Sequence, residues 1–193
     1  VEQRVGTVGR VHPHLEIKIV DEQGKVVPRG QLGELCVRGY SVMLGYWEDH
    51  EKSQEVIDSA RWMHTGDIAE MDEAGFVKIK GRIKDVVIRG GENLFPKEIE
   101  DFLYTHPDVS DVQVIGLPDA RYGEELCACI ILHEHHEITE ESIRQYCAEH
   151  ISHNKVPRYV RFFNEFPMTA SGKAQKFKLQ EFMRNELDLK EIA

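Results

Sequence analysis

The chain has 193 residues, which is enough for one compact domain or two small ones, and its 41% hydrophobic content supports a buried core. A formal net charge of −10 argues against a protein that coats nucleic acid, which would normally be basic. No apolar run approaches the roughly 18–20 residues of a membrane span, and no signal peptide opens the chain. The sequence starts abruptly at Val1, so we expect a truncated or excised segment.

Residues 1–80 have the pattern of short strands separated by turns. Apolar and polar positions alternate in the predicted strands, and Gly and Asp stand at the turns. The predicted elements are a strand over 14–21, a turn over 21–25, a strand over 33–42, a short helix over 48–57 and a hairpin over 71–82. This half of the chain is therefore predicted to be mostly β.

The second half mixes helices and strands. Pro96 occupies the first turn of a predicted helix, and Thr139 is placed to cap another, with Glu140 and Glu141 in its first turn. The predicted strands cover 85–91, 111–117, 125–132 and 160–166, and the predicted helices cover 97–106, 141–151 and 176–187. This order predicts a small α+β domain that begins near residues 82–85.

The four cysteines are too few for a disulfide framework. A reducing compartment therefore fits best, either the cytosol or an organelle matrix. Cys127 and Cys129 alternate within a predicted strand, so both should lie on one face of it as small core residues.

The stretch His-Glu-His-His-Glu at 133–137 raises the alternative of a metal site. It lies between a predicted strand and a capped helix, where a polar loop is expected. Zinc bound by imidazole would need further partners with defined spacing, and no second ligand cluster has it. We expect a solvated loop and assign no metal ligand.

Three short stretches could carry chemistry, and each also has a structural interpretation. Asp67, at the predicted end of a strand, is either a turn residue or a carboxylate that accepts hydrogen bonds from the vicinal hydroxyls of a ribose. Lys173 follows Gly172 in a loop without the Walker pattern, and is either part of a solvated turn or an ammonium group delivered to a developing anion. Gly90-Gly91 either ends a strand or lets the backbone approach a ligand closely.

Two further lysines follow Lys173. Lys176 and Lys178 add positive charge beside it, but a solvated helix face explains both equally well. Their role stays open at this point.

Four segments resemble the adenylate-forming acyl-CoA synthetase family, in sequence and in order: GELCVRGYSVMLGYW, WMHTGD, GRIKDVVIRGGENLFPKEIE and PMTASGK. The resemblance covers essentially the whole chain and is closest to the medium-chain fatty acyl-CoA ligases. That family converts a carboxylic acid and ATP to an acyl-adenylate and pyrophosphate, and then exchanges AMP for the thiol of coenzyme A. The resemblance implies ATP/AMP and coenzyme A as ligands, with Mg²⁺ accompanying ATP.

The resemblance also implies roles in the adenylation step. Asp67 matches the carboxylate that binds the ribose hydroxyls, and Arg82 matches an arginine that also contacts the ribose. Lys173 matches the lysine that bridges carboxylate, ribose and α-phosphate.

A second group of matched residues concerns the change between the two steps. Lys84 occupies the hinge position, which the family fills with Asp or Lys. Gly90 and Gly91, with Arg89 beside them, match the coenzyme A-binding loop that lines the pantetheine tunnel.

The implied domain organisation has three parts. Residues 1–81 would be the β-rich, barrel-like last subdomain of a large N-terminal domain, 82–84 a hinge and 85–193 a mobile α+β lid. The family's Ser/Thr/Gly-rich phosphate loop and acyl pocket lie upstream, and no such segment occurs in the 193 residues. We therefore expect the missing N-terminal domain of the same chain as a partner, and a fragment that is inactive alone.

Two alternatives stay open. One is an adenylation domain that serves an aryl acid or a carrier protein. The other is a non-catalytic interaction module, which predicts loss of the key side chains; Lys173, Arg82 and Asp67 are all present, and this weighs against it.

Overall fold

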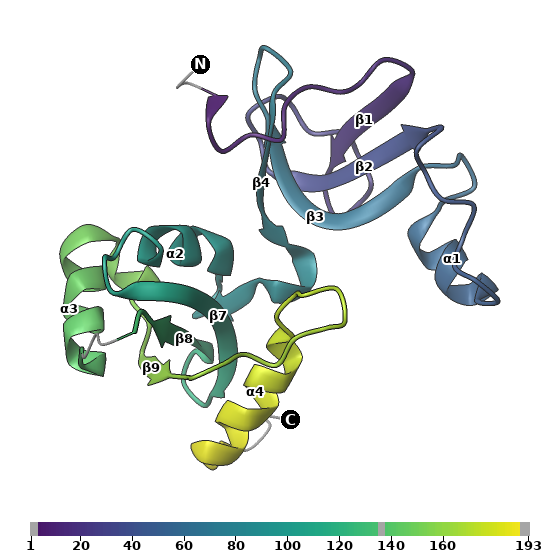
Figure 1. Ribbon diagram of the computed structural model, residues 1–193. Helices are drawn as coiled ribbons and strands as arrows, with labels where there is room; N and C mark the ends of the chain where they lie inside the picture. The colour runs from purple at the N-terminus through teal and green to yellow at the C-terminus, as the bar shows by residue number, and fades with distance from the viewer. Residues whose placement is uncertain (1–3, 135–137, 190–193) are drawn as a thin grey trace. The chain divides into compact units, whose positions relative to one another are not determined.

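The computed structural model describes residues 4–134 and 138–189, and the chain divides into two compact units, Val1–Lys84 and Asp85–Ala193 (Figure 1). The predicted polar loop over 133–137 falls mostly outside the described residues. None of the helices in the described ranges is long and apolar enough to cross a membrane.

The first unit is built on a four-stranded antiparallel sheet in the order β1-β2-β3-β4 (Figure 1). Its elements are β1 (Leu15–Val20), β2 (Gly33–Gly39), α1 (His50–Val56), β3 (Met63–Met71) and β4 (Val77–Arg82). The 3₁₀ turn η2 (Ile83–Asp85) contains the last two residues of this unit and the first residue of the second unit. Ile19, Ala69 and Val77 form the buried core of the first unit. The predicted strands, the short helix and the hairpin at 71–82 are confirmed.

One expectation for this unit is wrong. Asp67 does not end a strand, because β3 continues to Met71. Gly66 has a φ of +71° and lies where the pairing of β2 with β3 shifts register, between the partner pairs Cys36–His64 and Glu34–Ile68. The glycine therefore marks an irregularity inside a continuous strand, which the sequence pattern cannot distinguish from a strand end.

The second unit contains a five-stranded sheet in the order β6-β5-β8-β7, with β9 pairing parallel to β8. Its strands are β5 (Val87–Arg89), β6 (Glu92–Leu94), β7 (Val109–Asp119), β8 (Gly123–Leu132) and β9 (Tyr159–Phe162). Its helices are α2 (Pro96–Leu103), α3 (Glu140–His150), the 3₁₀ turn η3 (His153–Lys155) and α4 (Lys176–Glu186). The predicted mixture of helices and strands is confirmed.

The helices of the second unit cover both faces of its sheet (Figure 1). On one face, alternate residues of β8 such as Leu126 pack with α2 and α3. On the other, Cys127 and Cys129 pack with Leu179 and Met183 of α4. The prediction that the two cysteines share one face of a strand as core residues is confirmed, and all four cysteines are buried free thiols.

Gly90-Gly91 does not simply end a strand before a helix, because β6 follows it. Arg89 and Glu92 are partners in the β5–β6 register, so the two glycines are the whole hairpin turn. Their φ values of +60° and +85° are both positive, as a type I′ turn requires. A three-residue strand is too short to show a period of two, which is why the sequence pattern missed it.

Candidate functional site

Asp67 and Arg82 lie side by side on neighbouring strands. They are register partners in the β3–β4 pair, and Arg82 Nε lies 3.0 Å from Asp67 Oδ1. Arg82 Nη2 also donates to the carbonyl oxygen of Thr65 at 3.1 Å. The Asp67 side chain is 33% exposed and that of Arg82 is 52% exposed, so a ligand can reach both.

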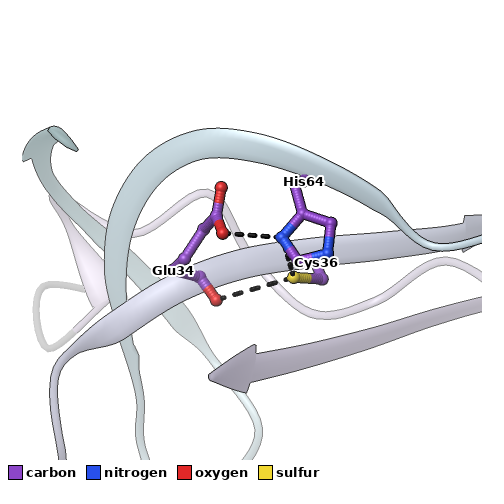
Figure 2. A group of neighbouring side chains, drawn as sticks. All are labelled: Glu34, Cys36 and His64. Carbon is purple, nitrogen blue, oxygen red and sulfur yellow. Dashed lines mark hydrogen bonds and ion pairs between the residues drawn. The ribbon is translucent and has the colours of Figure 1, made fainter. Parts of the chain in front are cut away.

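The β3 backbone before Asp67 is held from the neighbouring strand β2 by Glu34. Figure 2 shows its side chain facing His64. The two carboxylate oxygens have different partners. Oε1 accepts from the backbone N–H of Gly66 at 3.0 Å, and Oε2 accepts from His64 Nδ1 at 2.7 Å. Thr65 Oγ1 donates to the carbonyl oxygen of Leu35 at 2.8 Å. β2 therefore fixes the backbone that presents Asp67.

Glu34, Cys36 and His64 also form a possible metal-ligand set, because their ligand atoms all lie within 4.8 Å of one another (Figure 2). Their present contacts favour a hydrogen-bonded support. His64 Nδ1 lies 2.7 Å from Glu34 Oε2 and 3.5 Å from Cys36 Sγ. Burial and the nearby Glu34 carboxylate raise the pKa of Cys36 to about 11, so the thiol keeps its proton near neutral pH.

Lys84 is the last residue of the first unit and lies in η2 with an exposed side chain.

Arg89 precedes the glycine turn, and its side chain is held by a buried carboxylate. Its Nε lies 2.7 Å from Glu125 Oε2, and Nη1 donates to the carbonyl oxygen of Asn154 at 3.1 Å. The side chain of Glu125 is 2% exposed and that of Arg89 is 17% exposed. The guanidinium is thereby fixed to the sheet, whereas both glycines of the turn are exposed.

The two glycines of this turn have different surroundings. A Cβ at Gly90 would meet the Tyr122 ring at 3.3 Å, and the Gly90 N–H donates to the Tyr122 carbonyl oxygen at 2.8 Å. A Cβ at Gly91 would meet nothing within 4 Å. Gly91 is therefore the open side of the turn.

Lys173 lies at the end of a short hydrogen-bonded loop. Its backbone N–H donates to Thr169 Oγ1 at 3.0 Å, and its carbonyl oxygen accepts from the Thr169 N–H at 2.8 Å. Gly172 supplies the positive φ of +77° that the turn requires. The Lys173 side chain is exposed and makes no hydrogen bond or ion pair with a described residue. The loop thus presents a solvated ammonium group on an ordered backbone.

The structure brings together some of the predicted residues. Asp67 contacts Arg82, and Arg89 adjoins the glycine turn, whereas Lys173 lies on a separate loop. Sequence reasoning missed the carboxylates that support these groups, Glu34 and Glu125. Each lies more than 30 residues from its partner, and strand register, which the sequence did not reveal, decides the contact.

Two family models match the chain. The AMP-binding enzyme model matches residues 1–47, and the model of the AMP-binding enzyme C-terminal domain matches residues 98–173. Together they match more than half of the chain, in the order expected for the end of such an enzyme. The chain belongs to the AMP-binding enzyme family.

Curated members of this family are similar over nearly all of the chain. The medium-chain acyl-CoA ligase ACSF2, mitochondrial, of Bos taurus is 54% identical over 98% of the chain, which covers 31% of that protein. The Homo sapiens protein of the same name is 52% identical over 98% of the chain. YngI of Bacillus subtilis is 51% identical over 93% of the chain, covering 33% of its length. The chain thus spans about a third of these relatives and matches the C-terminal part of an acyl-CoA ligase.

Solved structures of the family are also similar to the chain. ATP-bound MatB from Rhodopseudomonas palustris is 35% identical, with a TM-score of 0.87 over 94% of this chain and 36% of that one. The anthranilate CoA ligase AuaEII, in complex with anthranoyl-AMP, is 36% identical with a TM-score of 0.87 over 96% of this chain and 36% of that one.

Proposed function

We propose that the chain is the C-terminal part of an ATP-dependent fatty acyl-CoA ligase. The complete enzyme converts a carboxylic acid, ATP and coenzyme A to acyl-CoA, AMP and pyrophosphate. The observation that carries the proposal is the 54% identity to a medium-chain acyl-CoA ligase over 98% of the chain. The Asp67–Arg82 ion pair and the exposed Lys173 support it.

Three residues act in the adenylation step. Asp67 accepts hydrogen bonds from the ribose hydroxyls, and Arg82 both orients this carboxylate and contacts the nucleotide. Attack of the acid on the α-phosphate gathers negative charge at pentavalent phosphorus, and the Lys173 ammonium group lowers that barrier. Mg²⁺ accompanies the ATP phosphates, and no side chain of this chain is assigned to hold it.

The thioester step uses the Gly90-Gly91 turn of the second unit. The Gly90-Gly91 turn has no side chains, so it leaves room for the long thiol arm of coenzyme A. Arg89, tied to Glu125, holds the strand from which the turn projects. A rotation about Lys84 presents Lys173 in the first step and the glycine turn in the second.

The domain organisation follows from the same proposal. The first unit is the last, barrel-like subdomain of the large N-terminal domain, residues 82–84 are the hinge, and the second unit is the lid. The phosphate loop and acyl pocket belong to the rest of the enzyme. The 193-residue chain alone therefore forms no acyl-adenylate, and pyrophosphate exchange catalysed by it would contradict this.

A ligase for aryl acids is the second candidate, because AuaEII, an anthranilate CoA ligase, is 36% identical to the chain. The experiment that separates the two is an AMP-release assay on the full-length protein with coenzyme A and acids of graded chain length. The fatty acyl ligase predicts a maximum at medium-chain acids. A maximum with benzoate-type acids favours the second candidate, and no AMP release with any acid favours a non-catalytic module.

The compartment is proposed to be a reducing one, cytosol or organelle matrix, because all four cysteines are free. The names of the relatives are compatible with both the cytosol and an organelle matrix. One is named mitochondrial, and another is from a bacterium.

A further inference from the structure

Lys176, three residues after Lys173, makes a half-buried ion pair with a different helix. Its Nζ lies 2.6 Å from Oε1 of Glu100 in α2 and donates to the carbonyl oxygen of Val114 in β7 at 3.0 Å. The Lys176 side chain is 21% exposed and that of Glu100 is 14% exposed. The interpretation of Lys176 as part of a solvated helix face is therefore wrong.

The same pair completes the hydrogen bonding of an edge strand. β7 is at the end of the sheet order, so no strand of the described residues pairs with the outer side of Val114. Glu100 Oε1 accepts from the Val114 N–H at 2.8 Å, while Lys176 binds the Val114 carbonyl oxygen. Glu100 and Lys176 together thus hydrogen-bond to both the N–H and the carbonyl oxygen of Val114. Three elements, α2, β7 and α4, are joined at this point.

The loop that carries Lys173 ends where this ion pair begins. The Gln175 N–H donates to the Pro167 carbonyl oxygen at 2.7 Å, and Met168 and Ala174 form a β-bridge. These contacts close the base of the loop directly before Lys176, the first residue of α4. By contrast, Lys178 is exposed, and its Nζ lies 6.0 Å from the centroid of the Phe177 ring.

We propose that Lys176 and Glu100 are positioning residues for Lys173. They fix the start of α4 to the sheet, and so fix where the loop holds the Lys173 ammonium group. Catalysis by a charged group depends steeply on its placement, so loosening the anchor slows the adenylation step. The thioester step does not use Lys173 and is spared. This inference rests on the proposed function.

The test uses the full-length ligase and measures the two half-reactions separately. Acyl-adenylate formation is followed by pyrophosphate exchange, and thioester formation is followed from supplied acyl-adenylate and coenzyme A. Lys176→Met is expected to slow adenylation about 10- to 100-fold, as a misplacement near 1 Å does, with little change in thioester formation. Lys176→Arg keeps the charge and both donor contacts, and should restore most of the adenylation rate.

Two further variants control for folding and for charge. Lys176→Met leaves the Glu100 carboxylate unpaired, so the double variant Lys176→Met/Glu100→Gln, which has no unpaired charge, is measured as well. It should still adenylate slowly while its thermal unfolding stays close to that of the wild type. Lys178→Met removes a neighbouring lysine of the same helix and should keep the wild-type rates.

The results that would overturn the inference are distinct from those that would overturn the proposed function. Equal losses in both half-reactions, or a double variant that adenylates like Lys178→Met, would contradict the positioning role alone. A wild-type enzyme that forms no acyl-adenylate from any acid would contradict the proposed function itself.

Discussion

Glu34→Gln is expected to destabilise the first unit by removing one support of the β3 backbone before Asp67. The carboxylate accepts from Gly66 and from His64 with different oxygens, and Gln keeps only one acceptor oxygen. A hydrogen bond to a charged group contributes about 1.5–3 kcal/mol, so the loss of one should cost about that amount. With a urea m-value of about 2 kcal/mol/M, the unfolding midpoint should fall by about 1 M.

Tryptophan fluorescence is the suitable assay because Trp47 and Trp62, the two tryptophans of the chain, both lie in the first unit. Glu16→Gln is the matched control: this carboxylate pairs with Arg38 at 2.7 Å but is 58% exposed, so its replacement should leave the midpoint close to the wild-type value. If Glu34→Gln unfolds at the same urea concentration as Glu16→Gln, the support role is wrong. A rise of the wild-type midpoint on addition of Zn²⁺ would instead indicate metal ligation by Glu34, Cys36 and His64.

Three further predictions concern single groups. Backbone N–H groups of Tyr122 and Arg121, and the Arg158 guanidinium at 2.6 Å, lower the pKa of Asp119. The stabilising contribution of Asp119 is therefore complete above about pH 4, the ordinary pKa in an unfolded chain, and is lost as the pH falls through the lower pKa of the folded state. Circular dichroism should show that Asp119→Asn reduces the acid sensitivity of the second unit. An unchanged acid transition would argue against this. Burial raises the pKa of both Cys36 and Cys147 to about 11. Iodoacetamide at about pH 8 should therefore label the native chain slowly and the urea-unfolded chain at all four thiols, which mass spectrometry would measure. Asp67→Asn in the full-length enzyme should raise the KM for ATP about tenfold through weaker ribose hydrogen bonds, and an unchanged KM would remove Asp67 from the nucleotide site.

The predicted elements agree well with the structure where a local pattern was long enough to read. β8 alternates its core faces over ten residues, and α3 has the Thr139 cap and a capping box with Ser142. β6 has only three residues, and Gly66 interrupts β3 without ending it, so local patterns failed at both. Each failure is at a glycine with positive φ or directly beside one.

The supporting contacts of the candidate site were beyond a single sequence. Glu34 reaches Gly66 across 32 residues, and Lys176 reaches Glu100 across 76. Such contacts depend on strand register and helix packing, which no local periodicity specifies. Residue type alone left Lys176 indistinguishable from Lys178, and burial separates the two: one is in a half-buried ion pair and the other is exposed.

The central claim is that one unit serves two half-reactions with two different surfaces. It is tested most directly by measuring both half-reactions in full-length Lys173→Ala and Gly91→Trp, with Gly91→Ala as the control for backbone strain at a φ of +85°. The account predicts that Lys173→Ala loses adenylation and keeps thioester formation, and that Gly91→Trp does the reverse while Gly91→Ala is much less affected. Loss of the same half-reaction in Lys173→Ala and Gly91→Trp would contradict it.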